Sequence, residues 1–181
     1  MAKFEIAYLG TGCFWCSEAI FKQLRGVINV MPGYAGGTTP DPSYEQVCSG
    51  LTGHAEVAKI EFDPGVISYE DLLEVFWYVH DPTSLNRQGN DVGTQYRSII
   101  LTASQLQKEK AEQSLKRLED SHQYDKPLVT VIEPLSHFYK AESYHQDYYA
   151  NHPDQSYCRL IISPKLQHLR QKYAAKLKGV A

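Results

Sequence analysis

Alternating apolar and polar positions open the chain and predict a strand, a helix and a second strand. Residues 4–9 alternate and run into a Gly-Thr-Gly turn, which is typical of a strand that leads into a helix. The helix is expected over 14–24, with a stop at Gly26. Residues 27–35 are predicted to form a second strand, and Pro32 limits this strand to an edge or a bulge because proline donates no ladder hydrogen bond.

The next part of the chain repeats this order between two long loops. Residues 54–62 alternate as a third strand, and the Ser-Tyr-Glu-Asp run after them is a capping box for a helix over 68–80. The segments 36–53 and 81–95 are polar or Gly/Pro-rich and lack a long periodic pattern. Long irregular loops are uncommon in compact domains unless they serve a function, so we expect functional residues in both.

Two more strands and two helices are predicted in the rest of the chain. Strands over 96–101 and 128–132 flank a helix over 104–122. A last helix over 163–178 begins at a Ser-Pro pair, with the serine as its cap and the proline in its first turn. The order predicts an α+β fold in a single domain, residues 1–181. We expect a two-layer mixed β-sheet with packed helices, a ferredoxin-like core, and a long, largely irregular C-terminal segment that ends in a helix.

Composition and charge narrow the classes of partner. The chain has 181 residues, a net charge of -3 and a pI near 6.1, so nothing favours a nucleic acid or an anionic membrane as partner. No apolar run has the length of a bilayer span, and the first residues lack the pattern of a signal peptide. Four cysteines are too few for a disulfide scaffold. We therefore expect a cytoplasmic monomer whose cysteines are catalytic, metal-binding or buried.

Two cysteines, Cys13 and Cys16, stand at the predicted start of the first helix. Free N–H groups and the helix dipole stabilise a thiolate at such a position, so Cys13 is a candidate nucleophile rather than only a buried small residue. A Cys13–Cys16 disulfide is also possible, which would fit a general thiol-disulfide oxidoreductase. A zinc site would need further ligands, and no second C-x-x-C motif provides them, so we expect no metal.

The residues between the two cysteines, Phe14 and Trp15, are needed by neither a redox pair nor a metal site. They are explained if the substrate carries a small apolar group beside the atom under attack, since they would form a hydrophobic wall next to the thiolate. Two other interpretations stay open. Both aromatics belong to the core of the first helical turn, or they line the pocket of a non-enzymatic module that binds a methylated ligand.

Three long motifs, GCFWC, GYAGGTTPDPSYEQVCSGLTGHAEV and HDPTSLNRQGNDVGTQYRS, resemble the peptide methionine sulfoxide reductases of type A. The resemblance runs from about residue 5 to Arg159. It implies reduction of the S epimer of methionine sulfoxide, free or in proteins, with thioredoxin as the external reductant and with no bound cofactor. In these terms Cys13 attacks the sulfur while Phe14 and Trp15 hold its methyl group. The implied role is the repair of oxidised proteins.

The resemblance also assigns the groups that act on the sulfoxide oxygen. This oxygen needs a proton to leave, and a carboxylic acid kept neutral by burial supplies one. Glu56 matches the acid of the family, although the residue taken alone would be read as a solvent-facing strand position. Tyr44 and Tyr96 match the two hydroxyls that hydrogen-bond the oxygen. Asp91 matches a loop carboxylate that binds water and the substrate backbone, and an ordinary turn residue is the alternative.

The thiol that resolves the Cys13 sulfenic acid is open between two candidates. Cys158, in a Ser-Tyr-Cys sequence, resembles the resolving cysteine that many members carry in Gly-Tyr-Cys. Cys16, which replaces a glycine of other members, is the alternative. Cys158 is preferred because a pair one turn apart in a helix must distort the helix to form a disulfide, and because residues 147–159 suit a mobile loop. Cys48 is interpreted as structural, and the histidines are given no chemistry.

Overall fold

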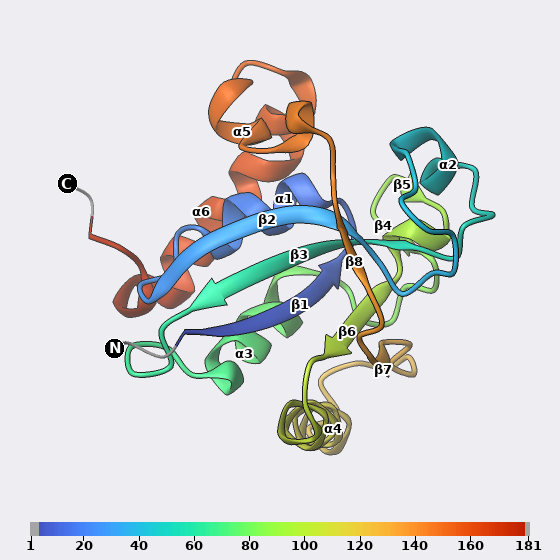
Figure 1. The fold of residues 1–181 in the computed structure, drawn as a ribbon. Coiled ribbons are helices and arrows are strands. Elements are labelled where there is room, and N and C mark those ends of the chain that lie inside the picture. Colours follow the sequence, from blue (N-terminus) through green and yellow to red (C-terminus); the bar gives the residue numbers. More distant parts are fainter. Residues whose placement is uncertain (1–3, 180–181) are drawn as a thin grey trace.

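A six-stranded sheet runs through the computed structural model, which describes residues 4–179 (Figure 1). The strand order is β7-β6-β1-β3-β2-β8. All neighbours are antiparallel except β6 and β7, which are parallel. The strands are β1 (Glu5–Thr11), β2 (Val27–Ala35), β3 (Ala55–Phe62), β6 (Ser98–Thr102), β7 (Val131–Pro134) and β8 (Phe138–Lys140).

The four central strands form the predicted ferredoxin-like core. Helix α1 (Phe14–Phe21) connects β1 to β2, and β3 lies between these two strands. Helix α3 (Tyr69–Val79) connects β3 to β6, and β1 lies between them. Each half is therefore a split β-α-β unit, and together they give the order β6-β1-β3-β2. The α+β fold class is confirmed.

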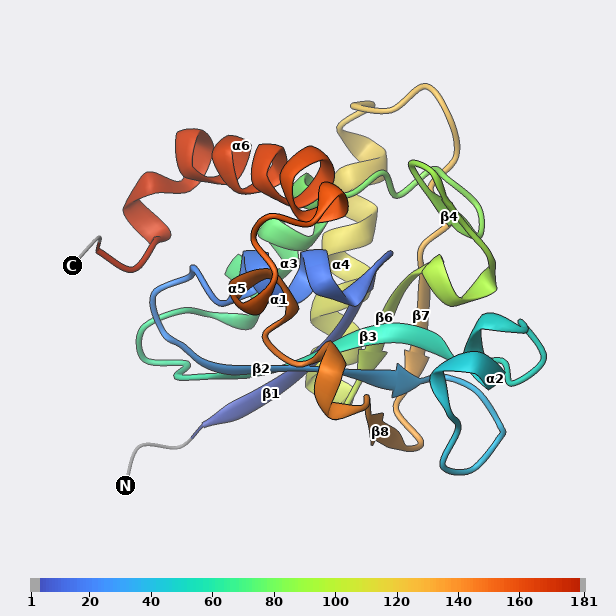
Figure 2. The ribbon, with the colours of Figure 1, turned by 90° about the horizontal axis from the view of Figure 1, so that it is seen from above.

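The alternation of side chains divides the sheet into two faces. Ala7 and Leu9 of β1 and Ile60 of β3 belong to the larger apolar cluster, which α1 and α3 cover. Tyr8 and Val57 point to the other face, into a smaller cluster. Figure 2 shows the C-terminal helix α6 (Ser163–Tyr173) beside α1, and both contribute to the larger cluster. The N-terminus of α1 is thus enclosed between the sheet and the C-terminal segment.

Smaller elements complete the chain. Helix α4 (Gln105–Asp120) packs on α3 and β6, and Ser104 caps it. Over residues 4–179, none of the helices combines the length and the apolar character that a bilayer span needs. The remaining elements are α2 (Tyr44–Cys48), a hairpin of β4 (Arg87–Gln88) and β5 (Asp91–Val92), α5 (Tyr148–Asn151), a π-helix (Cys158–Ile162), and short 3-10 helices at Thr94–Tyr96, Ser143–His145 and Ala174–Lys176.

The predicted strands and helices are all present, with shifted ends. The first helix ends at Phe21 rather than at residue 24, and β2 has its register shift between Val27 and Asn29 rather than at Pro32. The three-residue strand β8, which pairs with the last residues of β2 on its outer side, was not predicted. The predicted loop 81–95 contains the β4–β5 hairpin and part of a 3-10 helix.

The last helix begins at Ser163 with Pro164 in its first turn, as predicted, but the predicted serine cap is wrong. Ser163 is not a cap, because the π-helix Cys158–Ile162 runs directly into α6 and Ser163 already has helical dihedral angles. Its hydroxyl donates instead to the carbonyl of Cys158 at 3.0 Å. Pro164 is tolerated because it lies next to the π-helical turn, where the usual i to i-4 ladder is already interrupted. Cys158 therefore lies in a helix rather than in the predicted loop.

Candidate active site

Cys13 is the N-cap residue of α1, as the strand-turn-helix pattern predicts. Its backbone is extended, with φ -60° and ψ 125°, and its side chain is buried. The turn before it depends on Gly12, whose φ is +105°. A Cβ atom at Gly12 would lie 2.7 Å from Cγ of Gln88. Glycine is therefore required here both for the backbone angle and for the space.

The two thiols of Cys13 and Cys16 interact with each other. Burial, followed by the hydrogen bond with Cys16 and the charge of Glu56, raises the pKa of the Cys13 thiol. The same hydrogen bond lowers the pKa of Cys16. The predicted thiolate stabilisation by the helix N-terminus is thus outweighed by burial at Cys13. Of the two thiols, Cys13 is therefore the one that holds its proton more tightly.

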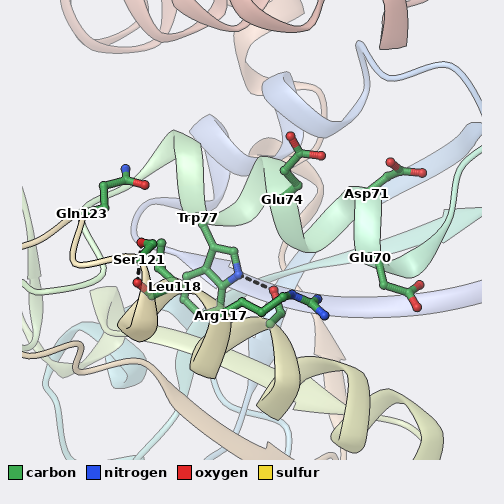
Figure 3. Close-up of a pocket in the computed structure, with 9 residues that line it drawn as sticks. Glu70, Asp71, Glu74, Trp77, Arg117, Leu118, Ser121 and Gln123 are labelled. Carbon is green, nitrogen blue, oxygen red and sulfur yellow. Dashed lines mark hydrogen bonds between the residues drawn. The ribbon is translucent and has the colours of Figure 1, made fainter.

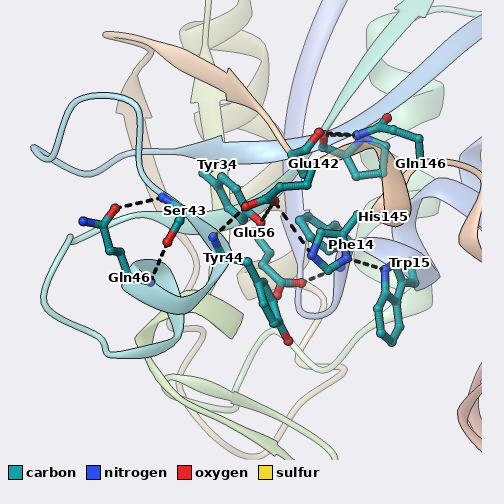
Figure 4. Close-up of polar contacts among 12 residues, drawn as sticks. Phe14, Trp15, Tyr34, Ser43, Tyr44, Gln46, Glu56, Glu142, His145 and Gln146 are labelled. Carbon is teal, nitrogen blue, oxygen red and sulfur yellow. Dashed lines mark hydrogen bonds and ion pairs between the residues drawn. The ribbon is translucent and has the colours of Figure 1, made fainter.

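Glu56 lies near the start of β3 and is almost completely buried. Its Oε2 accepts a hydrogen bond of 2.9 Å from the backbone N–H of Phe14, the residue that follows the nucleophile (Figure 4). Burial raises the pKa of Glu56 to about 8. The carboxyl group is therefore neutral at pH 7. The reading as a solvent-facing strand residue is wrong, because Glu56 shares the helix-covered side of β3 with Ala58 and Ile60.

The two predicted tyrosines, Tyr44 and Tyr96, lie close enough to Glu56 for its charge to contribute to the pKa of each phenol. Tyr44 is the first residue of α2, and its N–H donates to Oε1 of Glu142 at 2.8 Å. Tyr96 ends the 3-10 helix that follows the β4–β5 hairpin. Burial raises the pKa of both phenols, with smaller contributions from the charge of Glu56. Both are neutral hydroxyl groups at physiological pH and can donate hydrogen bonds.

Asp91, in β5, is joined to the C-terminal segment. Its Oδ2 accepts a hydrogen bond of 2.6 Å from the hydroxyl of Tyr157, which lies 3.8 Å from Sγ of Cys16. A cavity of about 390 Å³ opens beside these groups, and Cys13, Asp91, Tyr157 and Lys165 are among its lining residues. The structure thus brings Asp91 and Cys13 to one cavity, and places Tyr157 between Asp91 and the thiol pair.

The two aromatics of the motif have different surroundings. Phe14 is fully buried, with its ring 5.7 Å from Tyr34 and 4.9 Å from His145. Trp15 is half-buried and stacks on Tyr148 at 3.6 Å between ring centroids, while its Nε1 donates to Nδ1 of His145 at 3.1 Å. The core interpretation therefore fits Phe14, and Trp15 is the one of the two aromatics whose side chain is partly exposed.

A family model described as peptide methionine sulfoxide reductase matches residues 5–177. The chain belongs to this family. The MsrA protein of Picrophilus torridus is 52% identical over 175 residues, which cover 97% of this chain and 98% of the relative. The predicted activity, the reduction of methionine sulfoxide, is thereby confirmed.

Solved structures of the yeast relative resemble the reductase. Mxr1 from Saccharomyces cerevisiae in reduced form has a TM-score of 0.78 and 34% identity, and the match covers 87% of this chain and 91% of that one. Mxr1 in complex with Trx2 has a TM-score of 0.56 and 23% identity over 81% and 86% of the two chains, which supports the fold alone.

The other two cysteines of the reductase lie in different environments. Cys158 is fully buried in the π-helix that packs on α1, within the same apolar cluster as Cys13 and Cys16. Burial, followed by the charge of Cys16, raises the pKa of Cys158. Cys48 is exposed at the end of α2, and partial burial raises the pKa of its thiol. Cys48 is therefore not a core residue, and its structural role stays a prediction.

A second cavity of the reductase, of about 410 Å³, lies between α3 and α4 (Figure 3). Trp77, Arg117 and Leu118 are among its lining residues, and none of its lining residues is a predicted site residue. Three residues that the sequence did not single out, Tyr157, His145 and Glu142, form hydrogen bonds with Cys16, Trp15 and Tyr44. Their positions depend on how the C-terminal segment folds back, and the signal in the sequence is that His145 and Glu142 stand close together in one short run, AESYHQ.

Proposed function

We propose that this protein reduces the S epimer of methionine sulfoxide by direct attack of Cys13 on the sulfur. The observation that carries the proposal is the buried, neutral Glu56, hydrogen-bonded to the N–H of Phe14 beside the nucleophile. A sulfoxide oxygen leaves only when it is protonated, and a carboxylic acid with a pKa of about 8 holds a proton at neutral pH.

The chemistry balances with one thiol and one sulfoxide. Cys13 supplies the electron pair that reduces the sulfur, and the oxygen is transferred to Cys13 as a sulfenic acid while methionine leaves. Glu56 donates a proton to the oxygen and regains the thiol proton of Cys13, so the acid is not consumed. The hydroxyls of Tyr44 and Tyr96 are neutral donors that can stabilise the developing charge on the oxygen.

The substrate is held from two sides of Cys13. In our proposal Phe14 and Trp15 contact the methyl group on the sulfur, and Asp91 with Tyr157 contacts the backbone of the methionine. A site with three fixed groups around a chiral sulfur accepts one epimer, since the other would exchange its oxygen with its methyl group. We assign the S epimer, free or in proteins, from the likeness to the type A relatives.

For the resolution step the structure favours the alternative candidate, Cys16. Cys13 is an extended N-cap rather than a helical residue, so a disulfide with Cys16 does not have to distort the helix interior. The two thiols lie close enough for each to shift the pKa of the other. We propose that Cys16 condenses first with the Cys13 sulfenic acid and releases water. Cys158, buried in the same cluster, then attacks Cys16 and releases Cys13 as a thiol.

The external reductant in this proposal is thioredoxin. A yeast relative of the same fold has been solved in complex with a thioredoxin, Trx2. The proposed location is the cytoplasm, where thiols are kept reduced. The protein would act as a monomer with no bound cofactor.

A general thiol-disulfide oxidoreductase is the second candidate function. It is favoured by one observation, the two buried thiols of Cys13 and Cys16 at a helix N-terminus, each of which shifts the pKa of the other. Disulfide exchange involves no developing charge on an oxygen, so it would give no role to the two neutral phenols of Tyr44 and Tyr96. A non-enzymatic binding module would likewise need neither the acid nor the thiol pair.

An assay with separated epimers tests the proposal. The parent protein with a thiol reductant should convert methionine S-sulfoxide and leave the R epimer, and Cys13→Ser should convert neither. Disulfide exchange without loss of sulfoxide would instead support the oxidoreductase. Binding without turnover would support the module.

A further inference from the structure

His145 lies at the centre of the aromatic side of the site, although the proposed chemistry gives it no step. Its ring centroid is 4.9 Å from Phe14, 4.6 Å from Tyr44 and 5.7 Å from Trp15. The side chain is 1% exposed. A buried imidazole among substrate-facing rings needs a physical reason, because a purely apolar ring would fill the same space without a desolvation cost.

The hydrogen bond with Trp15 fixes the protonation of this ring. An indole N–H can only donate, so Nδ1 of His145 must be the unprotonated acceptor at 3.1 Å. Burial lowers the pKa of His145, so the ring is neutral at pH 7 and carries its proton on Nε2. Among residues 4–179, Nε2 has no hydrogen-bond partner and lies 3.9 Å from Oε2 of Glu142.

Glu142, three residues earlier, binds Tyr44 and Tyr34 on the side of His145 away from Trp15. Its Oε1 accepts from the N–H of Tyr44 at 2.8 Å, and its Oε2 accepts from the hydroxyl of Tyr34 at 2.7 Å (Figure 4). Gln146 anchors the segment to the sheet, since its Nε2 donates to the carbonyl of Pro32 at 3.1 Å. One short segment thus holds Trp15 of α1 and Tyr44 of α2 through two polar side chains three residues apart, His145 and Glu142.

We propose that His145 is a positioning residue that fixes the indole plane of Trp15 and so sets how tightly the site holds the methyl side of the sulfoxide. The proposal rests on the proposed role of Trp15 as a substrate-contacting wall. Tyr148 stacks on one side of the indole at 3.6 Å, but a stack resists sliding and in-plane rotation only weakly. The bond from Nε1 to His145 is the directional contact that stops this rotation.

Two variants separate the acceptor from the ring. His145→Phe keeps the aromatic contacts with Phe14 and Tyr44 and removes the acceptor. His145→Asn removes the ring, but its Oδ1 can take the place of Nδ1 as acceptor. Loss of one buried hydrogen bond predicts a fall of roughly tenfold in kcat/KM for methionine S-sulfoxide in His145→Phe, mainly through KM. His145→Asn should recover to within about threefold of the parent.

A double-mutant cycle with Trp15→Phe tests whether the effect passes through the indole. Trp15→Phe removes the donor, so adding His145→Phe to it should change kcat/KM no further. The same tenfold loss in the Trp15→Phe background would overturn the proposal, as would a His145→Phe enzyme with parental kinetics. If Trp15→Phe alone keeps the parental kcat/KM, the proposed role of Trp15 fails, and this inference fails with it.

An NMR measurement tests the positioning without any assay of turnover. The chain has two tryptophans, so a ¹⁵N-labelled sample gives two indole N–H signals, and Trp15→Phe assigns them. In His145→Phe the Trp15 signal should move upfield in the proton dimension as its hydrogen bond is lost, and in His145→Asn it should return toward the parental shift. The Trp77 signal, whose N–H donates to Ser114 at 2.8 Å, is the control for an intact fold. An unmoved Trp15 signal in His145→Phe would overturn the proposal even if sulfoxide reduction falls.

Discussion

The backbone N–H of Phe14 donates a hydrogen bond of 2.9 Å to the carboxyl group of Glu56. The bond joins the residue after the nucleophile to the acid in β3, so Cys13 and Glu56 cannot move independently. It also uses an N–H of the helix N-terminus that could otherwise stabilise a Cys13 thiolate. The geometry therefore keeps the neutral carboxyl group of Glu56 beside Cys13, and it does not favour a permanent thiolate at Cys13.

Replacement of Glu56 by Gln should slow the sulfoxide step about 10²–10⁴-fold, because the leaving oxygen then lacks its proton. In the parent, the single-turnover rate should fall as the pH rises through about 8, where Glu56 loses its proton. In Glu56→Gln the low rate should not show this fall. Rapid-quench measurement of methionine formation gives the rates of both proteins at each pH. Alkylation of Cys13 is the control that its thiol is still accessible in the variant. Parental rates in the Gln variant would rule Glu56 out as the acid.

The same carboxyl group should make the stability of the protein fall with pH. Its pKa is raised from 4.5 in the unfolded chain to about 8 in the folded protein, so the folded state binds the proton more tightly. The contribution to stability is complete below about 4.5 and is lost at about 1.4 kcal/mol per pH unit as the pH rises toward 8. Urea denaturation at several pH values should show this slope in the parent and a flatter one in Glu56→Gln. Equal slopes would contradict the raised pKa.

The burial of Glu56 shows what the sequence could and could not predict. The motif assigned the acid, and the alternation of Ala58 and Ile60 on the same strand could have placed it on the covered face. The strands and helices with clear periodicity, such as β3 and α3, were predicted nearly to their ends. Strand β8 was missed because a three-residue strand is too short to show alternation, and its pairing with β2 is a long-range contact.

Gly12→Ala should damage both stability and activity. The residue has φ +105°, and its added Cβ would meet the side chain of Gln88 at 2.7 Å. We expect a loss of about 1–3 kcal/mol in the free energy of unfolding and a lower kcat/KM, because the turn that places Cys13 must shift. Gly179→Ala is the matched control, since a Cβ there meets no atom within 4 Å. A Gly12→Ala protein with the stability of the control would mean that the turn adapts without strain.

The number of methionines formed without a reductant tests the order of the thiols. In a Cys48→Ser background the parent should form about two methionines per chain, because transfer of the disulfide to Cys16 and Cys158 frees Cys13 for a second reaction. Cys158→Ser should form about one and end with a Cys13–Cys16 disulfide in peptide mapping. A persistent sulfenic acid in Cys158→Ser, trapped by dimedone, would show instead that Cys158 resolves Cys13 directly.

The residues that the sequence could not place come from the C-terminal segment. Tyr157 meets Asp91 and Cys16, and His145 meets Trp15, across separations of 66, 141 and 130 positions. Such contacts follow from how the segment returns to α1, which no local periodicity encodes. The prediction of a mobile loop around Cys158 was wrong for a related reason. The π-helix is stabilised by packing on α1 rather than by a recognisable cap.

The most direct test of the account is a single turnover of each sulfoxide epimer by the reduced protein with no reductant present. Our account predicts prompt formation of methionine from the S epimer, with a sulfenic acid or disulfide at Cys13, and no methionine from the R epimer. It also predicts no methionine from either epimer with Cys13→Ser. Methionine formed by Cys13→Ser, or at equal rates from both epimers, would contradict it.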